Sequence, residues 1–268
     1  MLDNPLLERL DSNLRALKLY RIREHLETIL ESAGKDAPTY ADFLSKLLED
    51  ELAVKIEKQT ALSTSLAKLP YIKTLEAFDF SFQPSIDAKQ IKELAACLFV
   101  GRAENVIFLG PPGTGKTHLA VALGLKAIAN KYRVLFVSAA ALVASLNKVY
   151  AENRLEEKLK QYCMPRLLII DEIGYVPVDT HGAHLLFQIV SRRYEKGSIV
   201  LTSNRGFGQW DEIFGDAIIA TAILDRLLHH STVINIKGDS FRLKEKKRAG
   251  LLRSNNDEAG PEVLSKVI

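Results

Sequence analysis

This sequence of 268 residues has few cysteines and only a small net charge, and it lacks long apolar runs. Its two cysteines, Cys97 and Cys163, form no CxxC pair and have no histidine cluster beside them. We therefore expect neither a disulfide framework nor a zinc site. No apolar stretch approaches the roughly 20 residues of a membrane-spanning helix, and the first 30 residues interleave charges with leucines, unlike a signal peptide. These absences predict a cytoplasmic protein with no membrane partner.

The net charge of +3 is too small to indicate a nucleic-acid partner by itself. The charge is unevenly placed, however. Residues 1–70 hold ten Lys and Arg against twelve Asp and Glu, whereas residues 237–253 hold seven against two. The basic excess therefore lies outside the N-terminal segment.

The chain changes character near Pro70, where we place a domain boundary. Residues 1–69 carry leucines and isoleucines at helical spacing, which predicts a small all-helical N-terminal domain. Residues 70–104 are expected to form a linker and the start of the core, residues 105–250 the core itself and residues 251–268 a mobile tail.

Within the core, short β-branched runs alternate with amphipathic stretches, which is typical of an α/β fold with a parallel sheet. The predicted strands cover residues 105–109, 133–138, 166–171, 198–203 and 231–236. The predicted helices cover residues 116–130, 139–162, 182–196 and 216–230.

The segment GPPGTGKT follows the first strand and opens a helix, as a phosphate-binding P-loop requires. Its glycines let backbone N–H groups approach phosphates, the lysine supplies a positive charge to them and the threonine hydroxyl binds Mg²⁺. The alternative is a chance glycine-rich turn. The expected ATP-binding residues are Gly110, Pro111, Pro112, Gly113, Thr114, Gly115, Lys116 and Thr117.

A second motif, RLLIIDE, ends a buried strand in the adjacent carboxylates Asp171 and Glu172. This arrangement resembles a Walker B site, in which Asp171 lies near the metal and Glu172 near the attacking water. Thr117 and Asp171 are therefore the expected Mg²⁺ ligands. A solvated pair of carboxylates at a strand end is the alternative, which the upstream P-loop disfavours.

Two further polar residues complete the candidate site. Asn204 ends the strand SIVLTSN at the sheet edge where ligands of parallel α/β proteins bind, although a turn asparagine is the simpler interpretation of that residue alone. Arg226 lies in an otherwise apolar helix, where it forms either a surface pair with Asp225 or an arginine finger that reaches ATP on a neighbouring subunit.

Together these motifs identify a family resemblance. The segments GPPGTGKTHLAVALG, LLIIDEIGYVP, SRRYEKGSIVLTSN, ILDRLLHH and GDSFRLKEKK, with KTLEAFDFSFQPSID before them, resemble the IstB-type helper ATPases of insertion sequences. The resemblance implies an AAA+ fold with sheet order 5-1-4-3-2, a reduced or absent lid domain and kinship to DnaC-type helicase loaders and DnaA-type initiators. It also implies ATP hydrolysis and self-assembly on duplex DNA beside an IstA-type transposase.

The resemblance assigns roles to individual residues. It makes Asn204 the sensor-1 residue, Arg226 the finger acting between subunits and Arg242 a sensor-2-like contact. Phe78, in the stretch FDFSF, is expected to cover the adenine, with plain packing of the linker as an equal alternative.

In initiator-like relatives, extra helix after the second strand lines a DNA-binding surface. Here that region holds Lys148, Arg154, Lys158 and Lys160, whose positive charges suit phosphate contacts. A solvated charged helix face is the alternative, since nearby glutamates offset the charge. The resemblance also gives the N-terminal helices a role in DNA binding or oligomerisation.

We therefore interpret the chain as a nucleoid-associated ATPase that assembles on duplex DNA as a homo-oligomer and assists a transposase in target selection and strand transfer. The nearest alternative is a DnaC-like replicative helicase loader. A P-loop small-molecule kinase would explain GPPGTGKT but not Asp171, Asn204 and Arg226 together. A DNA-coating protein that binds ATP without turnover is the third alternative.

Overall fold

The computed structural model describes residues 5–175 and 177–248, and the chain divides between Ser63 and Thr64 into two compact units. The division lies within helix α4 (Tyr40–Leu66), a few residues before the boundary expected near Pro70. The tail expected at residues 251–268 lies outside the described residues.

The first unit contains α1 (Pro5–Ala16), α2 (Tyr20–Glu24), α3 (Leu26–Asp36) and most of α4. Glu51 of α4 is buried, and its carboxylate accepts hydrogen bonds from the backbone N–H groups of Arg21 (2.8 Å) and Ile22 (3.0 Å). Leu19, which precedes α2, offers no side-chain cap. Glu51 therefore caps the first turn of α2 from another helix.

The second unit is built on a five-stranded parallel sheet with the strand order β2-β3-β4-β1-β5. Reversed, this is the predicted order 5-1-4-3-2, so the expected sheet order is confirmed. The central strands are buried and largely apolar because helices cover both faces of a parallel sheet. The strands are β1 (Asn105–Leu109), β2 (Val134–Ser138), β3 (Leu167–Ile173), β4 (Ser198–Ser203) and β5 (Ser231–Asn235).

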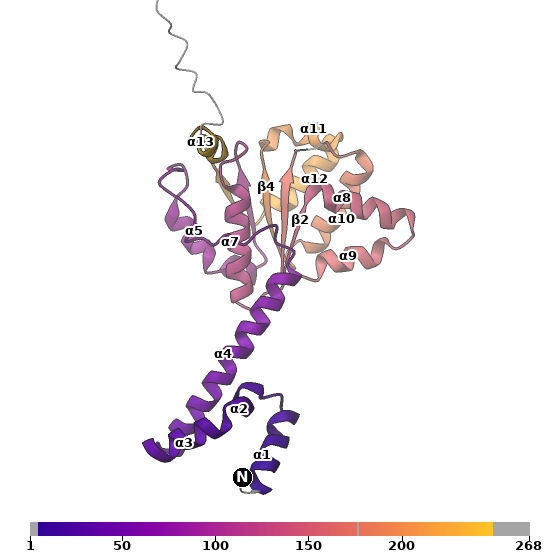
Figure 1. Ribbon diagram of the computed structural model, residues 1–268. Helices are drawn as coiled ribbons and strands as arrows, with labels where there is room; N and C mark the ends of the chain where they lie inside the picture. The colour runs from indigo at the N-terminus through magenta and orange to yellow at the C-terminus, as the bar shows by residue number, and fades with distance from the viewer. Residues whose placement is uncertain (1–4, 176, 249–268) are drawn as a thin grey trace, which may run out of the picture. The chain divides into compact units, whose positions relative to one another are not determined.

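Helices cover the two faces of the sheet (Figure 1). Those on the first face are α5 (Ala88–Ala95), α6 (Leu98–Gly101) and α7 (Lys116–Ala129). Those on the second are α8 (Ala139–Ala151), α9 (Leu155–Cys163), α10 (Thr180–Arg193), α11 (Trp210–Phe214) and α12 (Ala217–Leu228), with a short 3₁₀ helix at Phe207–Gln209.

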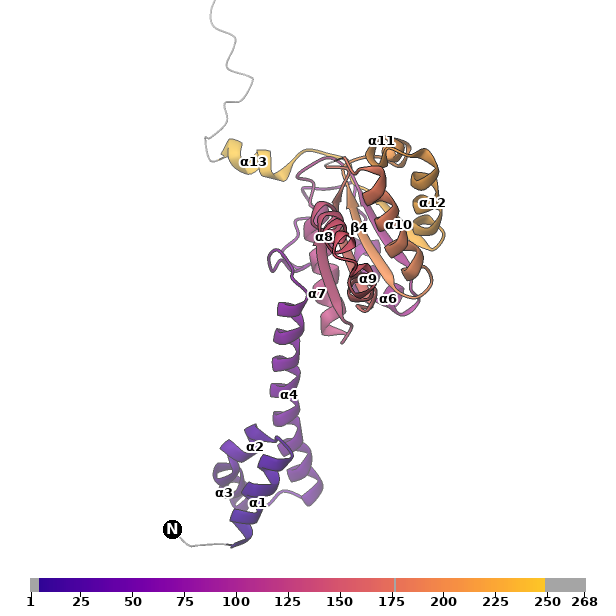
Figure 2. The ribbon, with the colours of Figure 1, turned by 90° about the vertical axis from the view of Figure 1, so that its right-hand side faces the viewer.

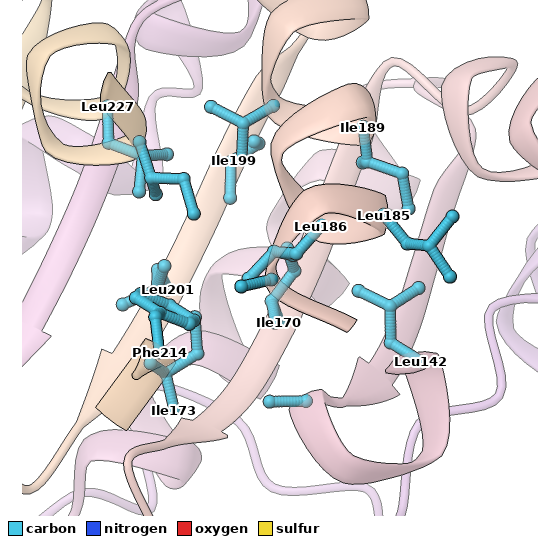
Figure 3. Packing of buried hydrophobic residues seen from close by; sticks show 14 of the residues in the cluster. Leu142, Ile170, Ile173, Leu185, Leu186, Ile189, Ile199, Leu201, Phe214 and Leu227 are labelled. Carbon is cyan, nitrogen blue, oxygen red and sulfur yellow. The ribbon is translucent and has the colours of Figure 1, made fainter. Parts of the chain in front are cut away.

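The second face holds a large apolar core, part of which Figure 3 shows. Leu185, Leu186 and Ile189 of α10 pack there with Ile170 of β3 and Leu201 of β4. This packing fixes the strand ends that carry the polar residues of the candidate site.

The helix expected over residues 139–162 is two helices, because α8 stops at Ala151 and α9 starts at Leu155. Asn153 between them has a left-handed backbone (φ 58°), which asparagine adopts more readily than most residues. The turn is closed by a hydrogen bond of 2.8 Å from the N–H of Arg154 to the carbonyl of Val149.

A buried arginine joins the amino ends of β3 and β4. The Arg193 guanidinium donates to the carbonyl oxygens of Pro165 (2.8 Å), Arg166 (3.0 Å) and Ser198 (2.7 Å). It is 1% exposed, and burial lowers its pKa to about 10. These hydrogen bonds align two neighbouring strands whose opposite ends carry Asp171, Glu172 and Asn204.

After β5 the described chain forms one further helix, α13 (Phe241–Arg248), which lies beyond the carboxyl ends of the strands (Figures 1 and 2). The described residues therefore contain no helical lid domain after β5. Among the residues that the structure describes, no helix is long and apolar enough to cross a membrane.

Candidate nucleotide site

The loop between β1 and α7 has a backbone that only glycine accepts at key positions. Gly110, Gly113 and Gly115 have φ angles of 151°, 78° and 96°. A Cβ atom on Gly110 would lie 2.3 Å from the carbonyl oxygen of Ile236, and one on Gly115 would lie 2.5 Å from the Phe78 ring. The loop thus leads tightly into the N-terminus of α7, whose free N–H groups favour anions.

Lys116 is the first residue of α7 and is buried. Its ammonium group donates to the carbonyl oxygens of Gly110 and Pro111, both at 2.7 Å. Burial lowers the pKa of Lys116, while the carboxylate of Asp171 acts in the opposite direction. The ammonium group of Lys116 is therefore held at the start of the glycine loop, beside Gly110 and Pro111.

Asp171 and Glu172 lie at an irregularity in β3. Ile170 pairs with Leu201 and Ile173 with Ser203, so the two carboxylate residues stand opposite one residue of β4, Thr202. Glu172 has a left-handed backbone (φ 62°). A bulge of this kind redirects side chains that would otherwise alternate between the faces of the sheet.

Hydrogen bonds fix both carboxylate residues. Thr117 donates to the two Asp171 oxygens at 2.9 and 3.1 Å, and Thr202 donates to Asp171 at 2.6 Å. The N–H of Glu172 donates to the Thr202 hydroxyl at 2.9 Å. Asp171 is buried, whereas the exposed Glu172 lines a cavity beside the loop.

This cavity has a volume of about 550 Å³, within the range of small-molecule and cofactor sites. Its lining includes the loop residues from Pro112 to Thr117, with Glu172 and Asn204. The linker after α4 and the start of α13 also line it, with Tyr71, Phe78, Phe82, Phe241 and Arg242. The polar groups of the P-loop and several aromatic rings therefore line the same cavity.

Asn204 contributes an unsatisfied acceptor to this cavity. Its Oδ1 atom is buried and has no hydrogen-bond partner among the described residues. Leaving such an atom unpaired costs about 1–3 kcal/mol, so a ligand or water that donates to it is favoured there.

The linker after α4 and the chain after β5, which are far apart in the sequence, contact each other beside the P-loop. The N–H of Phe241 donates to Gly113 at 3.0 Å, and Gln83 donates to the carbonyl of Asp239 at 3.1 Å. The rings of Phe82 and Phe241 meet edge to face with centroids 5.1 Å apart. The linker and the chain after β5 thus meet over the P-loop.

Phe78 both packs and lines the cavity. Its ring lies 4.9 Å from that of Phe80 and 5.1 Å from that of His118, between centroids, and its edge approaches Gly115. Packing and nucleotide contact, the two alternatives for this residue, are therefore compatible.

Comparisons with known proteins agree with this geometry. The sequence pattern described as "IstB-like ATP binding protein" matches residues 12–249. The chain belongs to this family. It is 50% identical over 260 residues to a protein of Pseudomonas aeruginosa assigned as the ATP-binding protein of insertion sequence IS21, covering 97% of this chain and 98% of that one. It is 47% identical over 240 residues to the corresponding IS5376 protein of Geobacillus stearothermophilus, covering 90% and 96%.

A solved structure shows the same fold. AMPPCP-bound DnaA from Aquifex aeolicus superposes with a TM-score of 0.54 at 25% identity, covering 70% of this chain. The chain spans 59% of the length of that DnaA chain. The IstB-like chain is thus an AAA+ protein related in structure to DnaA.

The two predicted arginines lie in different places. Arg242, at the start of α13, lines the cavity. Arg226 is not among the lining residues. On α12 its guanidinium donates to the carbonyl of Ala222 at 3.1 Å and lies 4.8 Å from the Phe187 ring centroid.

The four candidate DNA-contact residues differ in whether their side chains already have polar partners. Arg154 pairs with Glu157 (3.0 Å) and Glu152 (3.8 Å), while the Lys158 ammonium donates to Gln161 at 2.9 Å. Lys148 and Lys160 are exposed, and neither has a carboxylate within 4.0 Å in the described part of the chain. The charge most accessible to a ligand in this region is therefore that of Lys148 and Lys160.

Sequence reasoning did not single out Tyr71 and Thr202. Tyr71 lines the cavity, and burial together with Asp171 raises its pKa. Its place one residue after Pro70 gave no functional signal. Thr202 stands two residues before Asn204 in SIVLTSN, but an isolated strand threonine is usually explained by β propensity.

Proposed function

We propose that this IstB-like chain binds and hydrolyses ATP with Mg²⁺, and that a homo-oligomer of it on duplex DNA assists an IstA-type transposase in target selection and strand transfer. The observation that carries the ATPase proposal is the contact of Thr117 with Asp171 beside a cavity lined by Glu172 and Asn204. The names of the relatives support the link to insertion sequences.

The residues of the cavity suit Mg²⁺-ATP. Loop N–H groups and Lys116 would bind the phosphates, and the Thr117 hydroxyl with the Asp171 carboxylate would hold Mg²⁺, which prefers oxygen ligands. Bound Mg²⁺ neutralises charge that develops on the phosphates during hydrolysis. Phe78 and the other aromatic residues that line the cavity would cover the adenine.

Glu172 and Asn204 would act on the attacking water. Glu172 extends into the cavity from the bulge next to Asp171, so its carboxylate can accept a proton from water near the phosphates. The unpaired Oδ1 atom of Asn204 can accept a second hydrogen bond from the same water. Arg242, which lines the same cavity, would contact the phosphates as a sensor-2-like residue.

The position of Arg226 supports a role between subunits. Because it lies outside its own cavity, it would complete the site of a neighbour and stabilise charge in the transition state there. Hydrolysis would then require an assembled oligomer.

Duplex DNA would contact Lys148 and Lys160 first, with Arg154 and Lys158 as secondary contacts. The helices of residues 1–69 would contribute to DNA binding or subunit pairing, residues 70–104 would link them to the core, and residues 105–250 would hold the ATPase site. The assembly would act on DNA in the cytoplasm as a nucleoid-associated complex.

Steady-state phosphate release, measured with and without duplex DNA, tests the proposal. We expect turnover that needs Mg²⁺ and increases with DNA and with protein concentration. ATP binding without phosphate release under all these conditions would instead indicate a DNA-coating protein. Electron microscopy with DNA and a slowly hydrolysed ATP analogue tests assembly separately, and strand transfer by the transposase with and without this protein tests the helper role.

A further inference from the structure

The ends of α10 and α12 bring together residues that are far apart in the sequence. Tyr194 and Glu195 follow α10, and His229 and His230 follow α12. Within the described part of the chain, Glu195, His229 and His230 each place one potential metal-ligand atom within 4.8 Å of the others. The strand β5 begins at Ser231, so this cluster lies at the amino edge of the parallel sheet, opposite the P-loop edge.

The spacing of the cluster fits a tetrahedral metal ion. The Nε2 atom of His230 lies 3.5 Å from Oε1 of Glu195. Two ligands at about 2.0–2.1 Å from a tetrahedral ion are separated by roughly 3.3–3.4 Å, so little movement is needed to bind one. The imidazole centroids of His229 and His230 are 4.0 Å apart, which puts the second ring beside the same point.

A further residue orients the first imidazole. The Tyr194 hydroxyl lies 2.6 Å from Nδ1 of His229. In the tautomer that carries its proton on Nδ1, His229 donates this hydrogen bond to the Tyr194 oxygen, and the lone pair of Nε2 is free for a metal ion. Hydrogen bonds that the other ring N–H donates orient metal-binding histidines and strengthen them as ligands.

The electrostatic surroundings favour a cation. His229 caps the C-terminus of α12, where free carbonyl groups give a partial negative charge, and Glu195 adds a full one. All three candidate ligands are exposed, so water can occupy a fourth position.

We propose that Glu195, His229 and His230 bind a Zn²⁺ ion, with Tyr194 orienting His229. Two imidazoles and one carboxylate suit zinc, whereas Mg²⁺ prefers an all-oxygen set. The ion would join the ends of α10 and α12. These are the helices whose side chains Phe187 and Arg226 pack together at 4.8 Å, so zinc would hold the Arg226 helix in place.

Zinc titration of the full chain against a chromogenic chelator tests this site. Millimolar Mg²⁺ in the buffer occupies oxygen-rich sites, including any at Thr117 and Asp171, so that the titration reports nitrogen-containing sites. We expect the wild-type chain to take up one zinc ion that Mg²⁺ does not displace. Zinc should also raise the thermal unfolding temperature.

Three variants and one control separate this site from other zinc binding. His230→Asn and Glu195→Gln should no longer compete with the chelator for zinc. Tyr194→Phe should weaken zinc binding by about 10-fold or more. His184→Asn removes another exposed histidine, on α10 and outside the cluster, and should bind zinc as the wild type does. Circular dichroism checks that each variant is folded.

The proposal is overturned if the wild-type chain takes up no zinc in the presence of Mg²⁺. It is also overturned if folded His230→Asn and Glu195→Gln compete for zinc as the wild type does. Neither result would bear on the ATPase proposal, because the cluster contains no residue of the nucleotide cavity.

Discussion

Thr202 and Asp171 are joined by a buried hydrogen bond of 2.6 Å between neighbouring strands. The same Thr202 hydroxyl accepts the N–H of Glu172 at 2.9 Å. One side chain of β4 therefore fixes both carboxylate residues of β3 at the point where the strand bulges.

Thr202→Val should reduce ATP turnover by about 10-fold or more, because hydrogen bonds that orient a metal-binding carboxylate commonly have effects of that size. ATP affinity should change much less, since Lys116 and the glycine loop remain. Phosphate release and binding of a fluorescent ATP analogue measure the two effects. Thr202→Ser keeps the hydroxyl and should restore most of the turnover. Equal activity in the Val and Ser variants would show that the hydroxyl has no positioning role.

Lys116→Ala and Glu172→Gln should differ in kind. Lys116 contacts phosphate in the bound ground state, so its loss should remove ATP binding. Glu172 acts on water during the reaction, so Glu172→Gln should bind ATP normally and lose roughly 100-fold or more in turnover. It should also accumulate assemblies on DNA. Equal loss of ATP affinity in both variants would contradict this division of roles.

Arg226→Ala should keep ATP affinity and lose roughly 1,000-fold or more in turnover, as expected for an arginine finger. Mixing this variant with Lys116→Ala should restore phosphate release, because one supplies bound ATP and the other supplies Arg226. The control is a Lys116→Ala, Arg226→Ala double variant, which should not rescue Arg226→Ala at any ratio. Mixed assemblies that remain inactive would place Arg226 in its own subunit or in packing with Phe187.

DNA binding should be sequence-tolerant and salt-dependent, because it relies on ion pairs with phosphates. The double variant Lys148→Gln, Lys160→Gln should reduce the slope of log affinity against log salt by about 0.9 for each phosphate that the protein no longer neutralises. Arg154→Gln should have a smaller effect, since Glu157 and Glu152 already pair with it. A second basic patch is expected at residues 244–248, most of whose side chains lie outside the described ones. Affinity that does not depend on salt would exclude this mode of binding.

Lowering the pH should destabilise the protein partly through His118. Burial lowers the pKa of His118 below its ordinary value of 6.5, and its Nε2 atom lies 2.8 Å from the carbonyl oxygen of Thr74. The unfolded state therefore takes up the proton first, so this contribution is complete above pH 6.5 and declines as the pH falls through the folded-state pKa. Urea unfolding should show a smaller loss of unfolding free energy between pH 8 and pH 5 in His118→Gln than in the wild type. An equal loss in both proteins would exclude a contribution from His118.

The sequence by itself determined the α/β class, the strands and the P-loop. Each depends on local patterns: apolar runs of strand length, helical periodicity, and a glycine-rich motif between a strand and a helix. The strand order came from family resemblance, since periodicity does not specify which strands are neighbours. The break between α8 and α9 was missed because the helical pattern continues on both sides of Asn153, and one residue with a left-handed backbone leaves little trace in it.

Only the tertiary structure decided which side chains meet. Thr202 reaches Asp171 because β3 and β4 are neighbours and β3 bulges there, and Phe82 meets Phe241 because the linker and the chain after β5 cross over the P-loop. Glu195 approaches His230 because α10 and α12 end side by side. Residues so distant in sequence come together through packing of the whole core, and local spacing carries no record of such pairings.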